Sequence, residues 1–204
     1  IYFAITVGND NFMGLENYFQ LEGLAYRFVP IKTKSFDGQT GVVATEEMYD
    51  NLINKFKWGN MGDPNVYLDE TNMRMTMNFR NNFARLADAL IAEDQFEKAE
   101  KVLDRCIEVM PNEAIAYNYF NLPIADAYYR INKKEKGNEI VMTLAENYFD
   151  ELEYYNSIDE KILSSMQREY GMAGEVVNNL YRLSQNYQDS TAVNYLNERA
   201  ALIQ

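Results

Sequence analysis

Two stretches of regularly spaced apolar residues, separated by a short polar break, constrain the fold more than any other feature of the chain. Both stretches follow the spacing of one helix face, and the second ends at Pro111. The break is "AED" (92–94). The two stretches therefore predict a helix–turn–helix hairpin, in which the small Ala87 and Ala99 allow the helices to approach closely. The apolar residues are Phe83, Leu86, Ala87, Leu90 and Ile91, followed by Phe96, Ala99, Val102, Leu103, Cys106 and Ile107.

This hairpin resembles a tetratricopeptide-type repeat, because its bulky apolar residues, its small residues and the proline that ends its second helix lie at the positions that this repeat pattern requires. The matching residues are Phe83, Leu86, Ala87, Leu90, Ala99, Leu103, Cys106 and Pro111. A second unit is expected at 121–149. A third unit is expected at 159–187; it has a helix–Gly–helix layout, but its residues match the positions of the repeat pattern poorly. Ser190 would cap a last helix over 191–203. The expected fold is mainly α, with a superhelix of tetratricopeptide-like hairpins over residues 69–204.

The first 68 residues have a different character and predict a small α/β cap with two strands and two helices. The strands are expected at 1–7 and 23–32, where aromatic and β-branched residues are frequent. Between them, about two helical turns are expected, with Leu15, Tyr18, Phe19 and Leu21 on the apolar side. Residues 32–43 read as an exposed loop, 45–56 as a helix and 57–70 as a turn-rich connection with the only Trp, Trp58.

Composition excludes several kinds of chemistry. The net charge is −12, from 31 acidic and 19 basic residues, which disfavours nucleic acid and anionic lipid as partners. The chain has no His and one Cys, so it lacks the residues for His-based catalysis, for zinc sites and for an internal disulfide. No metal, cofactor or catalytic residue is expected. No stretch approaches the ~20 apolar residues of a membrane span.

The candidate ligand-binding residues are those that the repeat pattern places on the inner, concave helix face. Tyr, amide and acidic side chains on such a face suit a peptide or a glycan, although the same Tyr residues could simply pack between hairpins. These residues are Asn81 and Asp88 in the first unit and Tyr119, Asp126, Tyr129 and Arg130 in the second. The acidic run with Glu146, Asp150 and Glu153 fits no metal loop and is interpreted as a solvated face.

Four strings resemble the C-terminal region of a family of Bacteroidetes multi-spanning membrane proteins of unknown function. They are "IYFAITVGNDNFMGLENYFQLEGLAYRFVPIK", "NKFKWGNM", "VYLDET" and "NFARLADALI". The family is similar in membrane layout to protein O-mannosyltransferase-type glycosyltransferases. The resemblance implies that the chain follows the last membrane span and lies on the extracytoplasmic, periplasmic side of the inner membrane. It supplies no catalytic residue, because in such transferases the catalytic acid lies between early spans.

The expected function is therefore non-catalytic: a protein-interaction or acceptor-binding domain of a membrane glycosyltransferase-like protein. The expected partner is a protein or peptide, with a glycan acceptor as a further option. Two alternatives stay open. One is a free periplasmic solenoid adaptor that binds peptide or glycan, and the other, disfavoured, is a carboxylate-dependent hydrolase.

Overall fold

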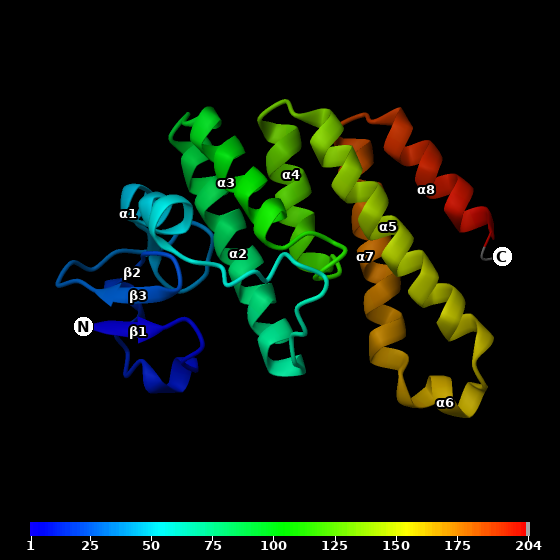
Figure 1. Cartoon of the computed structure of the whole chain (residues 1–204), viewed down its shortest axis with the longest axis horizontal. Coiled ribbons are helices and arrows are strands. Elements are labelled where there is room, and N and C mark those ends of the chain that lie inside the picture. The colour runs from blue at the N-terminus through cyan, green and yellow to red at the C-terminus, as the bar shows by residue number, and fades with distance from the viewer. Residues whose placement is uncertain (203–204) are drawn as a thin grey trace. The chain divides into compact units, whose positions relative to one another are not determined.

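The computed structural model of the protein describes residues 1–202 (Figure 1). The chain divides into two compact units. Unit 1 comprises Ile1–Ile115, and unit 2 begins at Ala116. Within the described residues the fold is mainly helical with a small sheet near the N-terminus, which confirms the predicted fold class. The predicted boundary between residues 68 and 69 falls just before the long helix α2 and stays a prediction.

Unit 1 begins with a small four-stranded sheet. The strands are β1 (Tyr2–Ala4), β2 (Phe19–Leu21), β3 (Ala25–Phe28) and β4 (Val42–Val43), in the order β1-β3-β2-β4. β3 is antiparallel to both β1 and β2, whereas β4 is parallel to β2. β1 and β4 are therefore the edge strands. Short 3₁₀ turns at Asn9–Asn11 and Glu16–Tyr18 connect β1 to β2.

The sequence predicts a helix where β2 lies, and this expectation is wrong. Phe19 and Leu21 are fully buried and Gln20, between them, is half-buried, which is the alternation of a strand. Phe19 also packs its ring on Phe12 and Tyr26, at centroid distances of 5.1 and 5.8 Å. Packing of this aromatic cluster outweighs the helical spacing of the neighbouring residues.

Three helices complete unit 1. Helix α1 (Thr45–Asp50) continues as a π-helical turn over Asn51–Lys55, and Met48 and Leu52 are fully buried. After an irregular loop come α2 (Glu70–Ala92) and α3 (Phe96–Val109), which pack together as the predicted hairpin. Ala87 and Ala99 have no exposed surface, as expected for small residues between close helices.

The hairpin contains two buried groups of note, Arg80 near its end and Cys106 in its core. The Arg80 side chain is fully buried, and its Nη2 donates to the carbonyl oxygens of Met110 (3.2 Å) and Ile115 (2.5 Å). Cys106 is fully buried on α3, and burial raises the pKa of its thiol to about 12. The only cysteine of the chain is therefore a core residue that remains protonated at neutral pH.

All regular elements in the described part of unit 2 are helices. A 3₁₀ turn at Tyr119–Asn121 leads into α4 (Leu122–Arg130), with Pro123 in its first turn. It is followed by α5 (Lys134–Ser157), α6 (Glu160–Ser165), α7 (Gln167–Asn186) and α8 (Ser190–Leu202). Gly137 on α5 faces the Tyr129 ring of α4, where an added Cβ would lie 3.1 Å from the ring. α4 and α5 therefore pack closely as the second predicted hairpin.

The third predicted unit differs from the structure. The sequence predicts two helices separated by a Gly. The structure has a short helix, α6, followed by α7, which continues through Gly171 and Gly174 without a break. Side chains of α7 such as Val176 and Leu180 are buried, and α7 packs against α5. This packing compensates for the low helix propensity of the two glycines. The predicted helix over 191–203 is α8, and its last residue, Ile203, lies outside the described residues.

Candidate functional site

The loop that precedes β4 is fastened to α2 by a buried arginine. The side chain of Arg85 is only 3% exposed. Its Nε donates to Asp37 Oδ2 (2.6 Å), and its two terminal nitrogens donate to the backbone oxygens of Thr40 (3.1 Å) and Gly41 (2.6 Å). One guanidinium group thus holds both a carboxylate and the backbone of the loop.

The partner carboxylate is held in its charged form. Burial alone would raise the pKa of Asp37, but hydrogen bonds from the Ser35 hydroxyl, the Gln39 backbone N–H and Arg85 lower it below the ordinary value. A second link lies one turn of α2 away, where Asn81 Nδ2 donates to Gln39 Oε1 (2.8 Å). The loop is therefore fixed at several points along α2.

Beside these links lies a cavity of about 500 Å³, which we call the α2 groove. Its apolar surface comes from β4 and from small residues of α2, and the side chain of Phe36 is fully exposed at its border. Its charged residues are three acids and Arg85, which is paired with Asp37, so the groove has a net negative charge. The lining residues are Ser35, Phe36, Asp37, Val42, Val43, Arg85, Asp88, Ala89, Ala92 and Glu93.

Two of the predicted ligand-binding residues lie on α2. Asp88 lines the α2 groove, and Asn81 is hydrogen-bonded to the loop through Gln39. The helical period thus places both residues on the side of α2 that the loop and the groove share. Their contact with a ligand remains a prediction.

The other predicted residues belong to unit 2, where Tyr129 and Asp126 meet around Tyr187. Tyr129 is buried, its ring stacks on Tyr187 at 4.7 Å between centroids, and its hydroxyl donates to Asn138 Oδ1 (2.5 Å). Burial also raises the pKa of Tyr129. Asp126 accepts a hydrogen bond from the Tyr187 hydroxyl (2.8 Å) and lies 3.8 Å from Arg130 Nη1. In the structure these groups therefore contribute to packing within unit 2.

Tyr119 is placed differently from Tyr129. Its side chain is 38% exposed and lies 4.4 Å from the Phe120 ring, while its backbone N–H donates to the Tyr148 hydroxyl (3.1 Å). Of the four predicted residues in unit 2, Tyr119 and Arg130 are exposed, Asp126 is half-buried and Tyr129 is buried. Their contact with a ligand stays a prediction.

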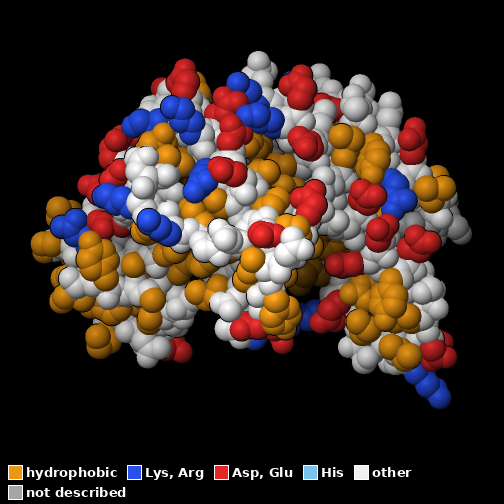
Figure 2. Space-filling model, viewed as in Figure 1, with side chains coloured by type: hydrophobic (Ala, Val, Ile, Leu, Met, Phe, Trp, Pro, Cys, Tyr) orange, Lys and Arg blue, Asp and Glu red, His pale blue; other side chains and the backbone are white. Residues whose placement is uncertain are grey.

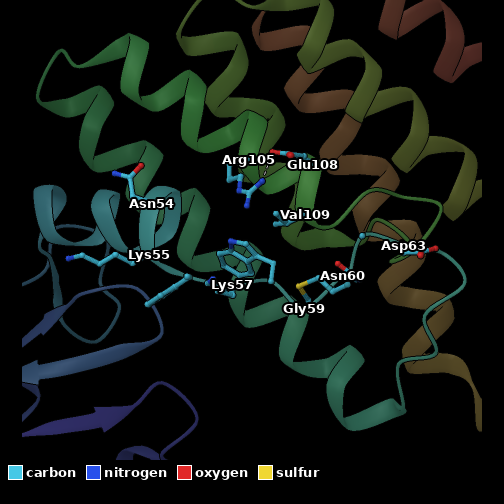
Figure 3. Close-up of a pocket in the computed structure, with 13 residues that line it drawn as sticks. Asn54, Lys55, Lys57, Gly59, Asn60, Asp63, Arg105, Glu108 and Val109 are labelled. Carbon is cyan, nitrogen blue, oxygen red and sulfur yellow. Dashed lines mark hydrogen bonds and ion pairs between the residues drawn. The ribbon is translucent and has the colours of Figure 1, made fainter.

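A second cavity, of about 840 Å³, was not predicted from the sequence (Figure 3). We call it the Trp58 pocket; it is lined by residues 54–63 together with Arg105, Glu108 and Val109. The Trp58 ring packs on Phe56, Phe79 and Phe83, with centroids 5.3 to 6.2 Å apart. The loop reaches the end of α3 at Gly62, where a Cβ would lie only 3.0 Å from the Glu108 carbonyl oxygen. A lone Trp in a loop with several Gly and Asn residues was the only sequence signal.

The described residues contain no group of three or more Cys, Asp or Glu side chains that could hold a metal ion. Of the acidic residues considered for hydrolysis, Asp150 forms an ion pair with Arg199 at 2.6 Å. Such a pair gives this carboxylate a structural partner on α8.

Comparison with known proteins gives one match. Residues 1–47 match the model of a family described as TMEM260-associated domain 2. This match covers 47 of the 204 residues and relates the N-terminal part of the chain to a domain that is associated with a membrane protein. No curated protein and no solved structure matches the chain, so the tetratricopeptide identity of the hairpins stays a prediction. Over the described residues, every helix is too short or too polar to cross a bilayer.

Proposed function

We propose that this chain is a non-catalytic interaction domain of a membrane protein, and that the α2 groove binds an extended segment of a partner polypeptide. The observation that carries the proposal is the groove itself. It has an apolar surface, negatively charged residues and the edge strand β4 among its walls. Exposed apolar surface of this kind is typical of an interaction site.

The groove favours a positively charged segment with apolar side chains. Val42, Val43 and Ala89 supply apolar contact surface, and Asp88 and Glu93 supply negative charge. As an edge strand, β4 has one side of its backbone outside the sheet, and extended peptides bind to such edges by adding a strand. A second copy of the chain is a poor occupant, because each copy carries a charge of −12 and the two would repel.

The match of residues 1–47 supports the membrane context. We propose, in addition, that the complete protein is glycosyltransferase-like, as the sequence resemblance implies. The domain would then lie on the periplasmic side of the inner membrane, attached through an N-terminal membrane part. In that context the polypeptide in the α2 groove would be an acceptor protein or an assembly partner. The domain itself would not be an enzyme and would need no cofactor.

Peptide binding tests the groove directly. A fluorescein-labelled octapeptide of alternating Lys and Val is titrated with the chain, and fluorescence anisotropy is measured. We expect saturable binding that weakens at least about tenfold, or about 1.4 kcal/mol, in Ala89→Arg, which places a bulky cation in the groove. The matched control is Tyr67→Ser, since Tyr67 is 88% exposed in unit 1 and does not line the groove. We expect this variant to bind like the original chain.

Two results would contradict the proposal. One is equal binding of an octapeptide of alternating Glu and Val, because the acids of the groove should repel it. The other is unchanged affinity in Ala89→Arg, because the peptide would then bind elsewhere on the chain.

A further inference from the structure

Two buried hydrogen-bond donors in the lining of the Trp58 pocket lack an acceptor. Trp58 Nε1 and Arg105 Nε are both buried, and neither has a hydrogen-bond partner among the described residues. The carboxylates of the pocket are already engaged: Asp63 accepts from the Asn65 backbone N–H and side-chain amide (both 2.9 Å), and Glu108 accepts from Arg105 (2.7 Å). A buried donor without a partner costs free energy, so such groups are expected to find an acceptor.

The charge of the pocket points in the same direction. Its lining contains three cations, Lys55, Lys57 and Arg105, and two acids, Asp63 and Glu108. Arg105 is paired with Glu108 (2.7 Å), and Lys55 is paired with Asp50 (2.5 Å), which does not line the pocket. Lys57 has no ion pair among the described residues. Figure 2 shows Lys and Arg side chains over the part of unit 1 that contains α1 and α3, interspersed with Asp and Glu. On the visible face of unit 2, Asp and Glu predominate. The charge of Lys57 is therefore available to an anion at this pocket.

The geometry allows these groups to act together. Figure 3 shows Arg105 and Glu108 extending from α3 on one side of the pocket and the loop with Lys57, Gly59 and Asn60 on the other. Gly59 and Asn60 both have positive φ, of 60° and 59°, which turns the loop back toward α3. The Met61 N–H donates to the Trp58 carbonyl oxygen (3.1 Å) and closes this turn. Lys57 and Arg105 thus lie on opposite sides of a preformed hollow.

We propose that the Trp58 pocket binds a small, soluble oxyanion that carries a phosphate or a carboxylate group. The charged oxygens of such a group accept hydrogen bonds, which matches the unpartnered donors Trp58 Nε1 and Arg105 Nε. Lys57 supplies a further positive charge from an exposed position. The site shares no residue with the α2 groove, so it can be correct or wrong independently of the proposed function.

The pocket contains its own reporter, because Trp58 is the only tryptophan of the chain. Its fluorescence is followed while the chain is titrated with inorganic phosphate and, separately, with citrate. Sodium chloride at matched ionic strength controls for screening. We expect a saturable fluorescence change with at least one of the two oxyanions and none with chloride. The two titrations identify whether phosphate or carboxylate is the preferred group.

Two variants locate the binding. Arg105→Gln and Lys57→Gln are each expected to weaken binding at least about fivefold, in line with the loss of one charge-assisted contact. Lys57 is exposed, so its substitution tests the site without disturbing the core. Lys101→Gln is the matched control, because Lys101 is an exposed cation on α3 outside the pocket. The proposal is overturned if neither oxyanion gives a saturable change, if chloride gives the same change, or if Lys57→Gln and Arg105→Gln bind like Lys101→Gln.

Discussion

Individual residues decide how the α2 groove is formed. Arg85 is the clearest case, because one buried guanidinium holds Asp37 and the backbone of Thr40 and Gly41. Asp37 and Arg85 are 48 positions apart in the sequence. No local pattern links two residues at such a distance, so the sequence predicted α2 and a loop over 32–43 but not the attachment of this loop to α2.

Replacing the carboxylate should destabilise this loop. In Asp37→Asn the buried charge of Arg85 loses its ionic partner but keeps two backbone acceptors. We therefore expect a loss of about 2 kcal/mol in the free energy of unfolding, below the full cost of breaking a buried pair. Urea unfolding followed by circular dichroism measures this loss. Asp63→Asn is a matched control, because Asp63 hydrogen-bonds only within its own loop.

The same carboxylate makes stability depend on pH. Because the folded-state pKa of Asp37 is lowered, its contribution is present above the unfolded-state pKa of about 4 and is lost as pH falls through the folded value. The difference in stability between the original chain and Asp37→Asn should therefore be constant near neutral pH and shrink below about pH 4. A difference that is unchanged at low pH would show that the ion pair does not cause it.

At the scale of the elements, the helices of unit 1 could be predicted because their apolar residues recur every three or four positions. Phe83, Leu86 and Leu90 on α2 are all fully buried, as this spacing requires. Strand β2 could not be recognised, since three residues are too few to establish an alternation against the helical spacing of Leu15, Tyr18 and Phe19. The Trp58 pocket was also missed, because its walls come from a loop and from α3, which lie far apart in the sequence.

The α2–α3 hairpin depends on small residues at its closest approach. Ala99→Leu adds three carbon atoms at a fully buried position, so we expect a destabilisation of about 1–3 kcal/mol through overpacking. Thermal or urea unfolding measures the change. Ala92→Leu is the matched control on α2, because Ala92 is exposed, and its stability should change little. Equal effects of the two substitutions would indicate that the helices do not meet closely at Ala99.

At the scale of the whole molecule, the question is where the complete protein resides. The match of the first 47 residues to a membrane-protein-associated domain agrees with the attachment proposed above. We expect an antibody against this chain to detect it with the inner membrane of the native cell, and protease added to spheroplasts to digest it. Detection in the soluble fraction at the size of this chain would contradict membrane attachment and favour the free periplasmic adaptor. Protection from protease would contradict the proposed periplasmic side.

The burial of Cys106 has a practical consequence. A thiol that is fully buried and remains protonated reacts poorly with alkylating reagents. A cysteine introduced at an exposed position, such as Phe36 beside the α2 groove, would therefore be the only thiol that a maleimide reagent labels readily in the folded chain. Fluorophores or spin labels can then be attached at one chosen site while the native cysteine stays in place.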